Sequence, residues 1–197
     1  MKKKKLAFMA SGSGTNFEHL VLEIQAGRID AEAALLVCDK PGAGVLARAQ
    51  KLAVPFALVD RKAFASKEAF EEEILKRLEA AKPDFIILAG YMRILSDAFV
   101  LRWWGKIINI HPSLLPAFPG AHGIRDAFEA KVPETGVTVH FVDTGVDTGA
   151  VILQRKVPVL PEDTLETLEA RVHETEYLLY PEALRLVLDG KIRMPDS

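Results

Sequence analysis

Short apolar runs alternate with segments of helical periodicity along the first half of the chain. The runs have the pattern of strands buried on both faces, and they cover residues 6–10, 33–37, 85–89 and 107–110. Between the first two, Phe17, Leu20, Val21 and Ile24 recur at the spacing of one helix face. The alternation predicts an α/β protein with a mostly parallel, open sheet flanked by helices.

The second half of the chain begins with a long loop. Residues 112–123 contain three prolines and two glycines, and loops of this length in compact domains are usually functional. Strands are expected over residues 137–142, where Thr138 and His140 share one face, and over residues 151–159.

A last helix is expected to begin near Asp163 or Thr164. Its buried stripe consists of Leu165, Leu168, Val172 and Leu179. Glu176 falls in the same stripe, where a carboxylate is costly unless it forms a salt bridge or binds a ligand hydroxyl. Pro181 is expected to kink or break this helix.

A glycine-rich loop, residues 11–16, connects the first apolar run to the first helix. Backbone N–H groups at such a helix start attract an anion, most often a phosphate. A dinucleotide fingerprint requires a third glycine where Phe17 stands, and the Gly-Lys-Ser/Thr of a Walker loop is absent. The loop is therefore either a cradle for a phosphomonoester, with Thr15 or Asn16 also capping the helix, or a tight structural turn.

The fourth apolar run ends in a pair of polar side chains. Pro112 cannot continue a central strand, and Asn109 and His111 project to the same side of the strand's carboxyl end. Ligands bind at this edge of open α/β sheets, and a carboxamide beside an imidazole can polarise a carbonyl and move a proton. A capped strand end is the alternative. Arg93 follows the third run, where it could bind a substrate acid or remain a solvated charge.

Composition and charge exclude several classes of protein. The formal net charge is -2 and the pI is about 6.2, so no overall positive field recruits nucleic acid. No apolar stretch has the length of a membrane span, and Cys38, the lone cysteine, excludes an internal disulfide and is expected to be a buried thiol. The five histidines lack metal-ligand spacing. These features predict a cytoplasmic protein of one domain, without a metal and without nucleic-acid or membrane partners.

Four motifs together resemble one family of enzymes. They are Ser-Gly-x-Gly-Thr-Asn at 11–16, Gly-Tyr-Met-Arg-Ile-Leu at 90–95, Asn-Ile-His-Pro-Ser-Leu-Leu-Pro at 109–116, and an Asp-x-Gly loop before the Val-Ile-Leu-Gln at 151–154. The combination is similar to the 10-formyltetrahydrofolate-dependent formyltransferases that act on glycinamide ribonucleotide (phosphoribosylglycinamide). The likeness extends from Leu6 to about Met194.

The resemblance implies a fold and a domain organisation. It implies a Rossmann-like formyltransferase fold with an antiparallel strand in the carboxyl-terminal half. Residues 1–197 would form a single formyltransferase domain, with a phosphate- and nucleotide-binding half at about 1–100 and a folate-binding, catalytic half at about 85–197.

The resemblance also implies a reaction. The glycinamide amine would attack the formyl carbon of 10-formyltetrahydrofolate, in the synthesis of purines. Asn109 would hold the formyl oxygen, and His111 would stabilise the tetrahedral oxyanion as a cation and help to pass the proton. Asp147 would keep His111 protonated, because a nearby carboxylate favours the charged form of an imidazole.

Binding residues follow from the same resemblance. Those expected to bind glycinamide ribonucleotide are Gly14, Thr15, Asn16, His173 and Glu176. Those expected to bind the folate are Lys67, Met92, Arg93, Ile94, Leu95, Asn109, Asp143 and Asp147. A lysine at position 67 can meet a carboxylate of the folate tail only as a point charge and not bidentately.

Partners and alternatives complete these expectations. The folate would be a co-substrate, with no permanently bound cofactor, and a homodimer is compatible with the resemblance. One alternative is a formyltetrahydrofolate hydrolase or another 10-formyltetrahydrofolate-dependent formyltransferase; such relatives usually carry an additional domain. A non-catalytic nucleotide-binding module is the other alternative, and it would leave Asn109, His111 and Asp147 without a role.

Overall fold

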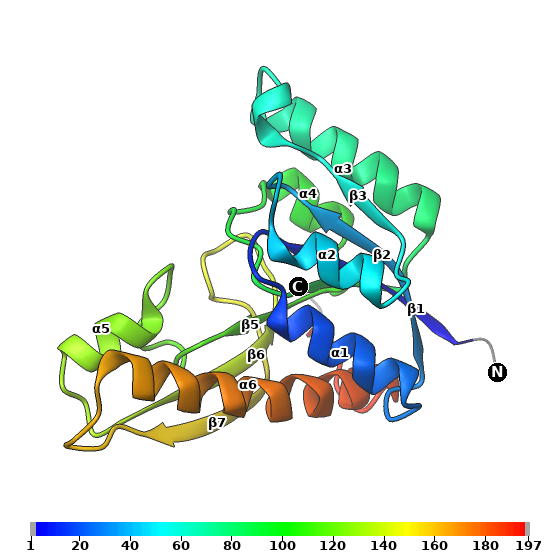
Figure 1. The fold of residues 1–197 in the computed structure, drawn as a ribbon. Helices are drawn as coiled ribbons and strands as arrows, with labels where there is room; N and C mark the ends of the chain where they lie inside the picture. Colours follow the sequence, from blue (N-terminus) through cyan, green and yellow to red (C-terminus); the bar gives the residue numbers. More distant parts are fainter. Residues whose placement is uncertain (1–2, 196–197) are drawn as a thin grey trace. The chain divides into compact units, whose positions relative to one another are not determined.

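The computed structural model describes residues 3–195, which form two compact units divided between Ile107 and Ile108. Within these residues, no helix is long and apolar enough to cross a membrane. The two units are described in turn (Figure 1).

The first unit is a parallel sheet with helices. Its strands are β1 (Lys4–Ala10), β2 (Ala31–Cys38), β3 (Phe56–Leu58) and β4 (Phe85–Leu88), in the order β3-β2-β1-β4. Its helices are α1 (Thr15–Gln25), α2 (Gly44–Lys51), the 3-10 turn η1 (Arg61–Ala63), α3 (Lys67–Ala81) and α4 (Asp97–Arg102). The pairings of β1 with β2 and β4, and of β2 with β3, are all parallel, as the apolar runs predicted.

The core of this unit forms where α1 packs on β1. Phe8 and Phe17 are fully buried and meet edge to face with ring centroids 5.2 Å apart. Cys38 is buried, as expected. The Ser96 hydroxyl accepts a hydrogen bond from the Phe99 N–H at 3.2 Å and so caps α4.

The second unit contains an antiparallel sheet. Its strands are β5 (Ile107–His111), β6 (Glu134–Phe141) and β7 (Val151–Pro158), and its helices are α5 (Gly123–Glu129) and α6 (Leu165–Leu188). Strand β6 pairs antiparallel with both β5 and β7, which confirms the expected change of strand direction. Helix α6 packs along β6 and β7 (Figure 1), and the buried Tyr180 hydroxyl donates to the Ile108 carbonyl at 3.1 Å.

A break at Pro181 and a polar cap on α1 were both expected, and both expectations were wrong. Helix α6 continues through Pro181 to Leu188, so the proline does not break it. The lost N–H costs about 3 kcal/mol, and the buried face of α6 offsets it by packing on the sheet. The cap of α1 is Gly14 in the left-handed conformation (φ 78°), so Thr15 and Asn16 are the first helical residues rather than its cap.

Candidate active site

The antiparallel pairing of β5 with β6 brings the polar residues of both strands together. Asn109 lies opposite His140, and His111 lies opposite Thr138. The Asn109 Nδ2 is 3.3 Å from the His140 Nε2. Because strand β5 ends before Pro112, the ladder stops where these side chains lie.

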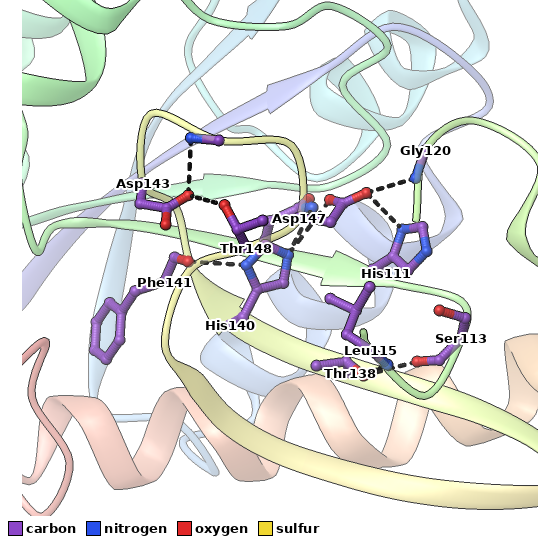
Figure 2. Close-up of polar contacts among 12 residues, drawn as sticks. His111, Ser113, Leu115, Gly120, Thr138, His140, Phe141, Asp143, Asp147 and Thr148 are labelled. Carbon is purple, nitrogen blue, oxygen red and sulfur yellow. Dashed lines mark hydrogen bonds and ion pairs between the residues drawn. The ribbon is translucent and has the colours of Figure 1, made fainter. Parts of the chain in front are cut away.

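His111 lies between two acceptors, of which Figure 2 shows Asp147. Its side chain is buried, and its Nε2 lies 2.8 Å from the Phe118 carbonyl oxygen, which can only accept a hydrogen bond. Its Nδ1 faces the Asp147 Oδ2 at 3.4 Å. Each nitrogen of the ring therefore faces an oxygen that can accept a hydrogen bond.

Asp147 is the carboxylate that both imidazoles share (Figure 2). Its Oδ2 accepts the Gly120 N–H at 2.8 Å, and its Oδ1 lies 3.6 Å from the His140 Nε2. Burial raises the pKa of Asp147, but contact with His140, the Gly120 N–H and the charge of His111 outweigh it and lower the pKa below its ordinary value. The group is therefore an ionised carboxylate at neutral pH.

The backbone of Asp147 is in an unusual conformation. Its φ is 55°, in the left-handed region of the backbone, which residues other than Gly, Asn and Asp rarely adopt. This conformation turns the acidic loop so that the carboxylate reaches Gly120, which lies in the loop after β5.

His140 is the residue of this cluster to which the sequence assigned no role. It is buried, and its Nδ1 donates to the Phe141 carbonyl at 2.8 Å; with the proton on Nδ1, the Nε2 can accept a hydrogen bond. That acceptor takes the Asn109 Nδ2–H, and it thereby orients the carboxamide. The shared face of Thr138 and His140 was visible in the sequence, but the partner of His140 depends on the register between β5 and β6.

Hydrogen bonds to β6 and β7 fix the start of the long loop 112–123. The buried Thr138 hydroxyl donates to the Ser113 carbonyl at 2.7 Å and accepts from the Leu115 N–H at 3.1 Å. Gln154 donates to the Leu115 carbonyl at 2.8 Å. The loop that supplies the Phe118 and Gly120 contacts is therefore anchored at its start.

Asp143 orders the acidic loop. Its Oδ1 accepts from the Gly145 N–H at 3.1 Å and from the Thr148 hydroxyl at 2.8 Å (Figure 2). These bonds hold the turn that carries Asp147, and they belong to the second unit, as does the rest of the cluster around His111.

In the first unit, the glycine loop is a tightly packed turn before α1. A Cβ on Gly14 would lie 2.4 Å from the Val45 side chain, so only glycine fits at this position. The Val45 N–H donates to the Gly12 carbonyl at 3.1 Å, and Arg48 Nε donates to the Ser13 carbonyl at 2.8 Å. The turn fixes the backbone from which Thr15 and Asn16 open the helix, the geometry that suits an anion.

The segment after β4 exposes apolar side chains. Met92 is 75% exposed and Ile94 is 67% exposed, whereas Leu95 is buried. The Met92 N–H donates to the Ser11 hydroxyl at 2.9 Å. Exposed apolar groups held on an ordered backbone are typical of a binding surface.

The two cations expected to bind the folate are paired with carboxylates of the same unit. Arg93 forms an ion pair with the buried Asp39, and Lys67 Nζ lies 3.8 Å from Glu71 Oε1. Arg93 is thus paired through Nε, while its side chain remains 43% exposed.

Glu176 and His173 form a pair on α6. Glu176 is buried within the apolar stripe, and its Oε2 lies 2.9 Å from the His173 Nδ1. The hydrogen bond to Glu176 raises the pKa of His173 above its ordinary value of 6.5, against a smaller opposing effect of burial. The salt bridge that the sequence left open is thus present, and one face of His173 stays accessible because its side chain is 49% exposed.

A titration can test this pair. In Glu176→Gln, the pKa of His173 should fall toward its ordinary value, because the carboxylate is the largest cause of the increase. Since the folded-state pKa is raised, the pair stabilises the fold fully below pH 6.5, and this contribution is lost as the pH rises through the raised value. NMR titration of the His173 ring measures the shift, with the exposed Glu73→Gln as a control; an unchanged pKa would contradict it.

Within residues 3–195, no group of three or more His, Cys, Asp or Glu side chains is arranged to hold a metal ion. The chemistry that the described residues can supply is that of an amide donor, an imidazole and an ionised carboxylate.

Comparisons with known proteins identify the family. A family model described as "Formyl transferase" matches residues 4–184. The phosphoribosylglycinamide formyltransferase of Bacillus subtilis is 46% identical over 185 residues, which cover 94% of this chain and 95% of that protein.

Solved structures give the same result. Glycinamide ribonucleotide transformylase 1 from Geobacillus kaustophilus is 52% identical with a TM-score of 0.92, covering 95% of this chain and 100% of that one. Phosphoribosylglycinamide formyltransferase from Bacillus halodurans is 46% identical with a TM-score of 0.92, covering 96% and 97%. The chain therefore belongs to the formyl transferase family, among the phosphoribosylglycinamide formyltransferases.

Proposed function

We propose that this chain transfers the formyl group of 10-formyltetrahydrofolate to the amine of phosphoribosylglycinamide, a step of purine synthesis. The observation that carries the proposal is the cluster at the end of β5, where Asp147 lies against both His111 and His140, and His140 contacts Asn109. An amide donor, an imidazolium and a carboxylate are the groups that acyl transfer to an amine requires.

The reaction assigns each group a role. The amine nitrogen forms a bond to the formyl carbon, and the electron pair of the C=O bond moves to oxygen. An Nδ2–H of Asn109 and the Nε2–H of His111 stabilise that oxyanion. The Nε2–H, which otherwise donates to the Phe118 carbonyl, donates to the oxyanion instead. The amine proton is passed to the N10 of the folate as the C–N10 bond breaks, which releases the N-formyl product and tetrahydrofolate.

Asp147 acts through His111 in this proposal. Its lowered pKa keeps it ionised, and a carboxylate 3.4 Å from Nδ1 favours the charged form of the ring. Its bond to the Gly120 N–H fixes the carboxylate in place.

The glycinamide ribonucleotide is assigned to two sets of residues. Gly14, Thr15 and Asn16 would bind its phosphate through the backbone at the start of α1. Glu176 would accept hydrogen bonds from the ribose hydroxyls, and His173 would hold that carboxylate and contact the sugar. A buried carboxylate in an apolar stripe supports such a role.

The folate is assigned to the segment after β4 and to the acidic loop. The exposed apolar Met92 and Ile94, together with Leu95, would line the pterin pocket. Asp143 would order the acidic loop that carries Asp147. Lys67 and Arg93 would meet the carboxylates of the folate tail.

We propose that residues 1–197 act as one formyltransferase domain. In this proposal the protein is located in the cytoplasm, has small-molecule partners and assembles as a homodimer.

A competition experiment tests the phosphate assignment. Inorganic phosphate should inhibit competitively against phosphoribosylglycinamide and not against the folate, because the start of α1 attracts the anion. Gly14→Ala should raise KM for phosphoribosylglycinamide selectively, since its Cβ would collide with Val45 and the φ of 78° is strained. Steady-state rates, measured with each substrate varied in turn, show which substrate phosphate competes with and which KM the variant changes. Phosphate competing with the folate would refute the assignment, as would tighter equilibrium binding of NAD or ATP than of phosphoribosylglycinamide.

A further inference from the structure

Arg93 is held from one side by a buried carboxylate. Asp39 follows β2, is 3% exposed, and contacts the Arg93 Nε through Oδ2. A buried carboxylate without a partner is strongly unfavourable, so the guanidinium offsets the cost of burying Asp39. Arg93 follows β4, and this ion pair therefore ties together two strand ends of the same sheet.

A ring holds the same guanidinium from a second direction. The Arg93 Cζ lies 5.6 Å from the centroid of the buried Phe70 on α3. A cation over an aromatic face is attracted by the ring, and the contact restricts the plane of the guanidinium. The ion pair and the ring together leave Arg93 few orientations.

The other end of Arg93 is available to a ligand. Its side chain is 43% exposed, and its bond to Asp39 uses only Nε. Among the described residues, none accepts a hydrogen bond from its two terminal nitrogens. Those nitrogens form the fork that binds a carboxylate bidentately.

In the described part of the chain, the Asp39 carboxylate has few partners other than Arg93, as expected of a residue that holds this guanidinium. Its Oδ1 is buried without a hydrogen-bond partner among the described residues, so Arg93 is its main compensation. The buried Tyr91 hydroxyl lies near enough for the Asp39 charge to contribute to raising the pKa of Tyr91, after the larger effect of burial.

We infer that Asp39 is a positioning residue, which holds the Arg93 guanidinium through Nε so that its terminal nitrogens receive a carboxylate of the glutamate tail of the folate. The inference rests on the proposed function. It distinguishes Arg93 from Lys67, whose ammonium can supply only a point charge. Asp39 would thus determine how strongly the enzyme selects co-substrates that carry a glutamate.

The test is Asp39→Asn, assayed with 10-formyltetrahydrofolate and with its analogue that lacks the glutamate, 10-formyltetrahydropteroate. We expect KM for the glutamate-bearing co-substrate to rise about tenfold, because an Arg side chain released from its anchor must be ordered by the ligand. The kcat and KM for the analogue should stay within about twofold, since the analogue has no carboxylate for Arg93 to bind. Glu73→Gln, which removes a carboxylate from an exposed ion pair with Arg77 on α3, is the matched control and should change neither KM.

Opposite results would overturn the inference. A lower KM in Asp39→Asn would mean that Asp39 competes with the ligand for Arg93, and an equal rise for both co-substrates would mean that it supports only the fold. In an Arg93→Met background, Asp39→Asn should raise neither KM further and should increase the Tm, because it removes the uncompensated charge. An additional rise in KM there would also overturn it.

Binding of 4-aminobenzoylglutamate, measured by calorimetry, separates this inference from the proposed function. If the wild-type chain lacked formyl transfer, the proposed function would fail. Weaker binding of this probe to Asp39→Asn than to the wild type would still support the positioning of Arg93, and equal binding would refute it.

Discussion

Asn109→Ala is expected to lower kcat about 10²–10³-fold, the usual effect of removing one oxyanion donor, and to change KM for either substrate far less. The donor is a carboxamide whose orientation is already set, because Nδ2 lies 3.3 Å from the His140 acceptor. The remaining Nδ2–H is then directed before the substrate arrives, and its hydrogen bond strengthens as negative charge develops on the formyl oxygen. The loss should therefore fall on the transition state.

Asn16, the only other asparagine of the chain, provides the contrast. Asn16→Ala makes the same chemical change at the start of α1, where the proposed role is phosphate binding, so it should raise KM for phosphoribosylglycinamide more than it lowers kcat. Steady-state kinetics of both variants show whether each substitution acts on kcat or on KM. An unchanged kcat in Asn109→Ala, with weaker folate binding, would show that Asn109 is a binding group only.

Asp147→Asn should lower kcat by at least about 10²-fold, the scale of a lost acid–base partner. Asparagine keeps the size of the side chain and can still accept the Gly120 N–H, so the acidic loop should keep its position. The substitution removes only the negative charge that lies 3.4 Å from the His111 Nδ1 and 3.6 Å from the His140 Nε2. A full loss of rate would then be assigned to charge and not to geometry.

The pH dependence of stability provides a second readout for Asp147. Its folded-state pKa is lowered, so its contribution is present above its ordinary value of 3.8 and is lost as the pH falls through the lowered value. As the pH falls, the difference in unfolding free energy between wild type and Asp147→Asn should persist down to about pH 4 and shrink below it, as the carboxylate takes up a proton. A difference that is already lost as the pH falls from 7 to 6 would contradict the ionised state of Asp147.

Strands and catalytic candidates could be predicted where a local pattern carries the information. The buried runs became β1, β2, β4 and β5, because continuous apolar segments of that length suit a sheet covered on both faces. Asn109 and His111 were identifiable since both lie at a strand end fixed by Pro112. The helix stripe likewise placed Glu176 in a buried position.

Contacts that depend on pairing between distant segments could not be predicted in this way. The role of His140 requires the antiparallel register that sets it opposite Asn109. The ion pair of Asp39 with Arg93 joins residues 54 positions apart, at the ends of two strands that are not neighbours in the sheet.

Local rules also failed where tertiary packing outweighed them. Pro181 lies inside a helix because the buried face of α6 compensates for its lost hydrogen bond. The start of α1 is set by the left-handed Gly14, packed against Val45, and not by a polar cap.

The most direct test follows the formyl carbon itself. Purified protein is mixed with phosphoribosylglycinamide and 10-formyltetrahydrofolate labelled with ¹³C in the formyl group, and the products are identified by NMR and mass spectrometry. The account predicts that the label appears in the N-formyl product in a one-to-one ratio with tetrahydrofolate, and that Asn109→Ala slows its appearance. Labelled formate released at the same rate with and without phosphoribosylglycinamide would contradict it, because water and not the amine would then be the acceptor.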